Sequence, residues 1–186
     1  CNDLRAEEGV DPTNDQKLDP LMVNVQLMAI AQIQANYSAI QLRDHLILGH
    51  SGIFPVGENI AAGWSGYNPF DGWYEEEKRL YENEDVGSAG HYLNIVSSDY
   101  STTGFAVNHY SAQAGFADFF GQTFYHDNIG GITLSVDEFA ALFDEYYKLV
   151  TDPDYVREWT EQILRQRLRN SKLPLSSETT RNGSRR

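Results

Sequence analysis

The stretch GHSGIFPVGENIAAGW, residues 49–64, sets a histidine, His50, eight positions before a carboxylate, Glu58. Residues 49–72 hold six glycines and two prolines. Because glycine and proline interrupt regular structure, we expect this segment to be a loop with at most one helical turn. It therefore presents a histidine and a glutamate on weakly structured backbone.

Two further motifs supply the same residue types. GWYEEEKRLY (72–81) contributes Glu76, and GHYLNIVSSDY (90–100) contributes His91. Neutral imidazole is the commonest ligand for zinc-like ions, and two carboxylates can orient a bound water or act as general base and acid. From spacing alone, the set is either a metal or acid–base site or four scattered polar side chains at loop edges. The candidate site residues are His50, Glu58, Glu76 and His91.

Length and charge bound the class of protein. A chain of 186 residues is expected to form one domain plus an appendage. Its 27 acidic and 14 basic residues give a net charge of -13, which disfavours binding to nucleic acid or anionic membranes. Residues 157–186 carry +5, so residues 1–156 carry -18. No apolar run reaches the ~18 residues of a membrane span.

The single cysteine, Cys1, excludes an internal disulfide. It leaves the compartment open, because reduced cytosolic proteins and many secreted bacterial proteins both lack disulfides. A first-position cysteine also fits the lipidated start of a bacterial lipoprotein. Against that, NDLRAEEGVDP (2–12) is typical of a helix end running into a loop, so we expect the chain to begin inside an element.

Periodicity and turn signals predict the main elements. Asp19 and Pro20 form a good N-cap and first helical position. We expect a helix to follow, with an apolar face at Leu21, Val25, Met28, Ala29 and Ile33.

A second helix is expected to begin near Asp71, with acidic residues at the positive end of its dipole. HYLNIVSSDY (91–100), TGFAVNHYS (103–111) and GQTFYH (121–126) are rich in aromatic and β-branched residues and are bounded by turn residues. They predict three antiparallel strands.

The sequence changes character after residue 133. Ser135 and Glu138 form a capping box, and Asp152-Pro153 opens another helix. We expect two helices whose apolar faces cover the sheet or the helical layer, with partner docking as the alternative. These faces consist of Val136, Phe139, Phe143, Tyr146 or Tyr147, and Val150, then Val156, Trp159 and Ile163.

Taken in order, the motifs resemble the CAP superfamily of cysteine-rich secretory proteins, antigen 5 and plant pathogenesis-related proteins. Its pattern is His-Ser, Gly-Glu-Asn-Ile/Leu, Trp-Tyr-x-Glu and Gly-His-Tyr, and the resemblance covers about residues 2–126. One departure is Asn94, which stands where the family usually has Gln. The matching segments are His50-Ser51, GENIA (57–61), WYEE (73–76) and GHY (90–92).

The resemblance implies an α+β fold: a three-layer α-β-α sandwich with a small antiparallel sheet and a central cleft, followed by C-terminal helices. The expected domains are residues 1–130 for the CAP domain, 131–169 for a helical extension and 170–186 for a disordered tail.

The resemblance also implies that His50 and His91 bind a divalent metal, zinc foremost. Glu58 and Glu76 would flank the ion through water, and Glu75 lies one position from the motif register. Because zinc sites usually have three or four protein ligands, two ligands predict a weak, exchangeable site.

The implied function is that of an extracellular or cell-surface protein of the bacterial branch, whose cleft binds metal and a small-molecule, lipid or peptide ligand. Because fold alone does not fix activity, two alternatives stay open. One is a metal-dependent hydrolase in which Glu58 or Glu76 activates a water; the other is an interaction protein that uses its acidic face. The natural ligand and the oligomeric state stay open.

Other motifs give weaker signals. Residues 125–136 fail as a calcium loop, because Tyr125 and Val136 stand where acids are required. The segment GENIAAGWSG lacks the Gly-Lys-Ser/Thr of a phosphate-binding loop. Ser51 beside His50 has no elbow motif around it, which disfavours a serine nucleophile. The remaining histidines are expected at the surface, at a helix end or on strands: His45, His109 and His126.

Overall fold

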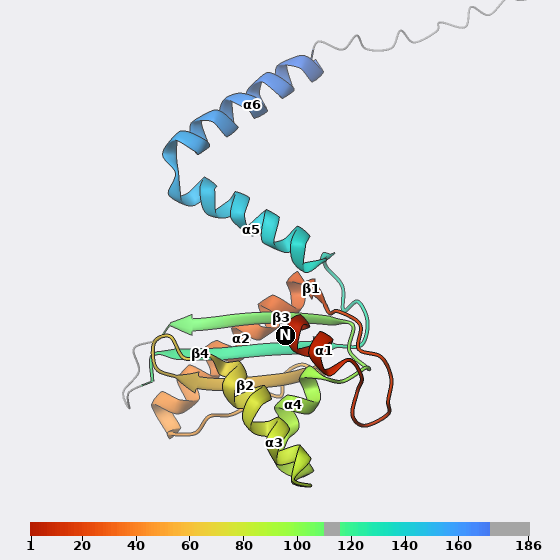
Figure 1. Ribbon diagram of the computed structural model, residues 1–186. Coiled ribbons are helices and arrows are strands. Elements are labelled where there is room, and N and C mark those ends of the chain that lie inside the picture. Colours follow the sequence, from red (N-terminus) through yellow and green to blue (C-terminus); the bar gives the residue numbers. More distant parts are fainter. Residues whose placement is uncertain (110–115, 172–186) are drawn as a thin grey trace, which may run out of the picture. The chain divides into compact units, whose positions relative to one another are not determined.

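The computed structural model describes residues 1–109 and 116–171, which divide into two compact units between Phe139 and Ala140. The first unit is a five-stranded sheet with helices on both faces (Figure 1). The predicted α+β, three-layer sandwich is confirmed. No helix in these described ranges is both long enough and apolar enough to cross a membrane.

The sheet has the strand order β2-β4-β3-β1-β5. All its pairings are antiparallel except β1 with β3. Two of the three predicted strands are confirmed, as β3 and β4. The expected loop at residues 49–72 is wrong in part, because strand β2 lies within this range. The glycines and alanines of β2 have low strand propensity, so the sequence pattern did not indicate a strand there. The strands are β1 (Met22–Asn24), β2 (Gly57–Gly63), β3 (Thr102–His109), β4 (Asp118–Tyr125) and β5 (Thr133–Leu134).

The third predicted strand is wrong, because residues Gly90–Ile95 form helix α4. Tyr92, Ile95 and Val96 are all buried, and their three- and four-residue spacing is that of one helical face. Aromatic and β-branched residues favour strands in general, but here packing of this short apolar face overrides that preference.

Helix α2 (Val25–His45) begins later than predicted. Its N-cap is Asn24, whose side chain accepts hydrogen bonds from the backbone of Gln26 and Leu27, so the predicted start at Asp19 and Pro20 is wrong. The predicted apolar face is also wrong, since Val25 and Ile33 are exposed. The face that packs inward contains two polar residues, which concealed its period; it consists of Leu27, Ile30, Ala31, Gln34, Ala35, Ser38 and Ala39.

Helix α2 lies directly against one face of the sheet, behind the strands in Figure 1. A Cβ atom on Gly104 of β3 would overlap the backbone of Leu27 and Met28. A Cβ atom on Gly121 of β4 would lie 2.6 Å from the carbonyl oxygen of Ala31. Two adjacent strands therefore carry glycine where the helix crosses them.

The other face of the sheet packs against α1 (Asn2–Glu8), α4 and the segment that leads into α3 (Glu77–Glu82). Part of that segment is a π-helix, η1 (Asp71–Glu76), and a short 3₁₀ turn, η2 (Val86–Ser88), follows α3. The helix predicted to begin near Asp71 is thus confirmed. The buried core on this face consists of Leu18, Leu21, Ala61, Trp73, Tyr74, Ala89, Tyr92, Ile95, Val96, Phe120 and Phe124.

The carboxylate of Glu8 fastens α1 to η1, α3 and α4. It accepts hydrogen bonds from Tyr74 (2.7 Å), Lys78 (2.7 Å) and Tyr92 (3.1 Å). Burial opposes ionisation of Glu8, but these hydrogen bonds and the Lys78 charge lower its pKa below the ordinary value. Burial, and then Glu8 itself, raise the pKa of both phenols. The cluster is therefore held by a charged carboxylate and neutral tyrosines.

After β5 the chain forms helices α5 (Val136–Thr151) and α6 (Pro153–Ser171). The predicted capping box of α5 is confirmed, because Ser135 N donates to Glu138 Oε2 at 2.8 Å and Glu138 N donates to Ser135 Oγ at 3.2 Å. The covering role of the apolar faces and the domain boundaries at 130 and 169 stay predictions. Most of the predicted tail, residues 172–186, lies outside the described residues.

Substituting Gly104→Ala tests the contact between α2 and the sheet. The added methyl group meets helix backbone, which cannot rotate away, so we expect a loss of about 3 kcal/mol in the free energy of unfolding. Urea denaturation measures it. Gly87→Ala is the control, because nothing lies within 4 Å of its Cβ position. Equal stability of the two variants would contradict the close approach.

Substituting Glu8→Gln tests the charged cluster through pH. Because folding lowers the pKa of Glu8, its stabilisation is present above the unfolded pKa of about 4.3 and is lost as the pH falls below it. We expect the variant to be less stable than the parent at pH 7 and the gap to close towards pH 3. Urea midpoints across this range measure it, with the exposed neighbour Glu7→Gln as control. A gap that does not change with pH would refute the assignment.

Candidate functional site

His50 and Glu58 form the first of two histidine–glutamate pairs. His50 lies in the segment between α2 and β2, and its Nδ1 is 3.0 Å from Oε2 of Glu58 on β2. The imidazole is 49% exposed, whereas the Glu58 side chain is only 7% exposed. The second carboxylate oxygen, Oε1, is buried and has no hydrogen-bond partner among the described residues. The pair thus joins an accessible ring to a buried carboxylate with one unused acceptor.

His91 and Glu77 form the second pair. His91 is in the first turn of α4, and its Nδ1 is 2.5 Å from Oε1 of Glu77. The other oxygen, Oε2, accepts hydrogen bonds from the backbone N–H groups of His91 (2.7 Å) and Tyr92 (3.1 Å). These N–H groups lie at the start of a helix, where no helical partner is available. The Glu77 carboxylate therefore binds the free N–H groups at the start of α4 and also orients the His91 ring.

The carboxylate beside His91 is Glu77, and sequence reasoning missed it. Glu76 and Glu75 are both exposed. Burial, and then the charge of Glu76, raise the pKa of the Tyr67 phenol. The π-helix η1 (Asp71–Glu76) explains the register, since its i→i+5 hydrogen bonds place more residues in each turn than an α-helix does. The carboxylate that reaches His91 therefore lies one residue later.

Two asparagines connect the pairs across strand β2. Asn94 Nδ2 donates to the carbonyl oxygen of Glu58 (3.4 Å) and to Oδ1 of Asn59 (2.9 Å). Asn59 Nδ2 donates to the carbonyl oxygen of His91 (3.2 Å). Asn59 thus faces α4, and strand alternation directs the Glu58 side chain to the other face. The pairs lie on either side of β2, which is an edge strand of the sheet.

Both pairs use the same chemistry. Each carboxylate engages Nδ1, which makes Nε2 the nitrogen left for a ligand. A carboxylate on one ring nitrogen fixes the tautomer and orientation of a metal-binding histidine in many proteins. Across the described ranges, no three His, Cys, Asp or Glu side chains gather into a group that could hold a metal ion. Each pair is therefore a single oriented imidazole.

The other sequence candidates lie outside this arrangement. Ser51 Oγ is buried and has no hydrogen-bond partner in the described structure, which is not the environment of an accessible nucleophile. His45 is exposed at the end of α2, and the rings of His126 and Tyr125 are tilted to one another by 36° with centroids 4.2 Å apart. His109 is exposed and binds Asp118 at 2.7 Å.

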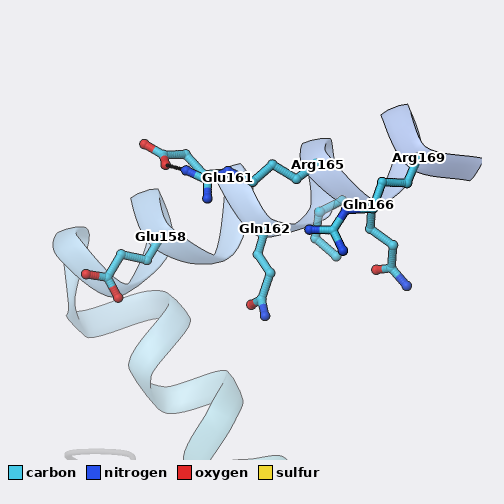
Figure 2. Close-up of a pocket in the computed structure, with 7 residues that line it drawn as sticks. Glu158, Glu161, Gln162, Arg165, Gln166 and Arg169 are labelled. Carbon is cyan, nitrogen blue, oxygen red and sulfur yellow. Dashed lines mark hydrogen bonds and ion pairs between the residues drawn. The ribbon is translucent and has the colours of Figure 1, made fainter.

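A surface hollow in the second unit is not a convincing ligand site. All seven of its lining residues come from α6 and project from that single helix, as Figure 2 shows. Ligand pockets bury most of a ligand's surface between converging walls. The hollow has one wall, so the histidine–glutamate pairs remain the candidate site. Its lining residues are Glu158, Glu161, Gln162, Ile163, Arg165, Gln166 and Arg169.

Fold and site together define an α-β-α sandwich with a histidine–carboxylate pair on each side of an edge strand. Comparison with protein families matches residues 1–125 to the CAP, or Cysteine-rich secretory protein, family. The chain belongs to this family, which confirms that part of the sequence interpretation.

Comparison with solved structures gives two similar chains. One is an outer surface protein from Borrelia burgdorferi, with 13% identity and a TM-score of 0.38, covering 68% of this chain and 86% of that one. The other is BmVAL-1, with 17% identity and a TM-score of 0.41, covering 72% of this chain and 74% of that one. The comparison with curated proteins gives no match.

Substituting Glu77→Ala, compared with Glu76→Ala, tests which glutamate serves His91. Glu77 makes charge-assisted hydrogen bonds to two backbone N–H groups and a ring, so we expect its loss to cost about 2 kcal/mol of unfolding free energy. Loss of the exposed Glu76 is expected to cost less than about 0.5 kcal/mol. Urea denaturation at pH 7 measures both. A larger loss of unfolding free energy in Glu76→Ala than in Glu77→Ala would instead assign Glu76 as the carboxylate beside His91.

Proposed function

We propose that this chain is a CAP-domain binding module in which His50 and His91 are the protein ligands for a divalent cation, zinc foremost, at the edge of strand β2. The observation that carries the proposal is the pair of oriented imidazoles, each held at Nδ1 by a glutamate. Such an arrangement leaves two Nε2 lone pairs, the usual zinc ligand of histidine.

The surroundings of Glu58 fit a positively charged or proton-bearing group. Its side chain is almost fully buried, and Oε1 has no partner within the described residues. Leaving a buried charged acceptor unsatisfied costs free energy, so a cation or a water bound to one supplies what this oxygen lacks. The residues present therefore fit a metal at the His50 side of the strand.

The protein side chains would divide the work. The two imidazoles bind, Glu58 and Glu77 orient the rings, and Asn59 and Asn94 hold β2 against α4. When bound, the ion supplies Lewis-acid polarisation of an oxygen ligand. With only two protein ligands, the site is expected to be weak and exchangeable, and to complete its shell with water or with the ligand that the module binds.

The hydrolase alternative finds less support in this geometry. Glu58 holds the His50 ring through Oε2, and Glu77 uses both oxygens on His91 and the start of α4. Glu76 is exposed, and the carboxylates bound to the two imidazoles are Glu58 and Glu77. A general base must reach the proton that it removes. Both oxygens of Glu77 are engaged, and the one oxygen of the two pairs without a partner among the described residues, Oε1 of Glu58, is buried. Binding of a small-molecule, lipid or peptide ligand is the better-supported role.

Family membership also supports an extracellular or cell-surface location. The family takes its description from secretory proteins. The single cysteine supports membership of the disulfide-poor bacterial branch as part of this proposal. The strongly acidic first 156 residues disfavour nucleic acid as a partner.

Zinc titration by calorimetry tests the proposal. The parent chain is expected to bind zinc weakly, and His50→Ala and His91→Ala are each expected to reduce the affinity at least about tenfold. His45→Ala is the control, because this histidine is exposed at the end of α2. No binding below millimolar zinc, or an equal loss in the control, would refute the site.

A parallel screen separates binding from catalysis. Peptide and ester hydrolysis is measured with and without zinc, using the parent and His91→Ala. We expect no turnover in either. Zinc-dependent hydrolysis that His91→Ala abolishes, with the fold intact by circular dichroism, would establish the hydrolase instead.

A further inference from the structure

The side chain of Gln34 on α2 forms hydrogen bonds to the backbone on both sides of His50. Its Oε1 accepts a hydrogen bond from the N–H of Ser51 at 2.8 Å, and its Nε2 donates to the carbonyl oxygen of Gly49 at 2.9 Å. The amide thus pairs with one residue before the histidine and one after it, as a neighbouring strand would. Gln34 is fully buried.

Ser38, one helical turn further along α2, completes the contact. The second N–H of the Gln34 amide donates to Ser38 Oγ at 3.0 Å, and Ser38 Oγ donates to the Gly49 carbonyl at 3.3 Å. Burying an amide and a hydroxyl is unfavourable unless they are hydrogen-bonded. The Gln34 carbonyl oxygen, one of its N–H groups and the Ser38 hydroxyl proton have these partners only while residues 49–51 keep this conformation.

The segment around His50 has little structure of its own. Residues 47–53 belong to no helix or strand, and they include Gly49 and Gly52. A glycine-containing segment has many accessible backbone conformations, so contacts from another element are needed to fix the orientation of a ring within it. These contacts come from α2, which itself lies directly on the sheet that carries Glu58.

We propose that Gln34 is the positioning residue of His50: it fixes the backbone on either side of the ring so that Nδ1 meets Glu58 and Nε2 is held ready for the cation. The inference rests on the proposed zinc-binding function. It assigns a role to a buried polar residue on a helix face where apolar side chains are the rule.

The test variant is Gln34→Met, which keeps the length of the side chain and removes its hydrogen bonds to Gly49, Ser51 and Ser38. Gln32→Met on the same helix is the matched control, because Gln32 is exposed and its amide donates to Asn36 and not to residues 49–51. The first measurement is long-range ¹H–¹⁵N NMR of the His50 imidazole without metal, at a pH where the ring is neutral. The parent and control are expected to show one tautomer, with the proton on Nδ1, and Gln34→Met a mixture.

The second measurement is zinc affinity in a double-mutant cycle with His50→Ala. Gln34→Met is expected to weaken binding about tenfold in the parent and not to weaken it further once His50 is gone. An equal loss in both backgrounds would assign Gln34 a general structural role and overturn the proposal. A single tautomer with unchanged affinity in Gln34→Met would overturn it as well.

Two outcomes are separated in advance. If the parent binds no zinc, the proposed function fails, and the NMR comparison alone decides the positioning role. If Gln34→Met does not fold by circular dichroism, Ser38→Ala replaces it, because it removes only the hydroxyl that supports the amide. A smaller shift towards a tautomer mixture then supports the proposal, and an unchanged ring overturns it.

Discussion

The direct contact of α2 with the sheet at Gly104 and Gly121 is the constraint on which the first half of the site depends. With no Cβ between them, helix and sheet come close enough for Thr123 Oγ1 to donate to the carbonyl oxygen of Leu27 at 2.9 Å. The inward face of α2 carries Ala31 where the helix crosses Gly121, and the polar Gln34 follows one turn later. The segment that Gln34 holds is therefore placed by the sheet, although it belongs to no regular element.

Strand β2 brings the second half of the site into place through its outer edge. A strand edge leaves backbone groups without a strand partner, and proteins cover such edges. Here side chains do so: Trp73 Nε1 donates to the carbonyl of Ile60 at 2.9 Å, and Asn94 donates to the carbonyl of Glu58. Trp73 belongs to η1, just before Glu77, and Asn94 belongs to α4, which carries His91. Covering the edge of the sheet therefore also brings α4, which carries His91, against the strand that carries Glu58.

The elements that could be predicted from sequence are those set by local signals. The capping box at Ser135, the helix near Asp71 and strands β3 and β4 all have clear caps, turns or alternation. The start of α2 and the existence of β2 and α4 depend on tertiary contacts, which local propensity does not encode. For the site, motif order gave His50, Glu58 and His91, but nothing local marked Gln34, because a buried amide on an amphipathic helix looks like an exposed one.

Glu77 shows a different limit. Residues 75–77 are three identical glutamates, so chemistry cannot choose among them, and a motif spacing assumes one helix geometry. The local geometry is π, and two adjacent aromatic side chains within it are buried and anchored, Trp73 to the Ile60 carbonyl and Tyr74 to Glu8. These two anchors fix the rotation of the helical segment that leads to Glu77. The identity of the glutamate beside His91 is thus decided by how α1 and β2 hold the residues before it.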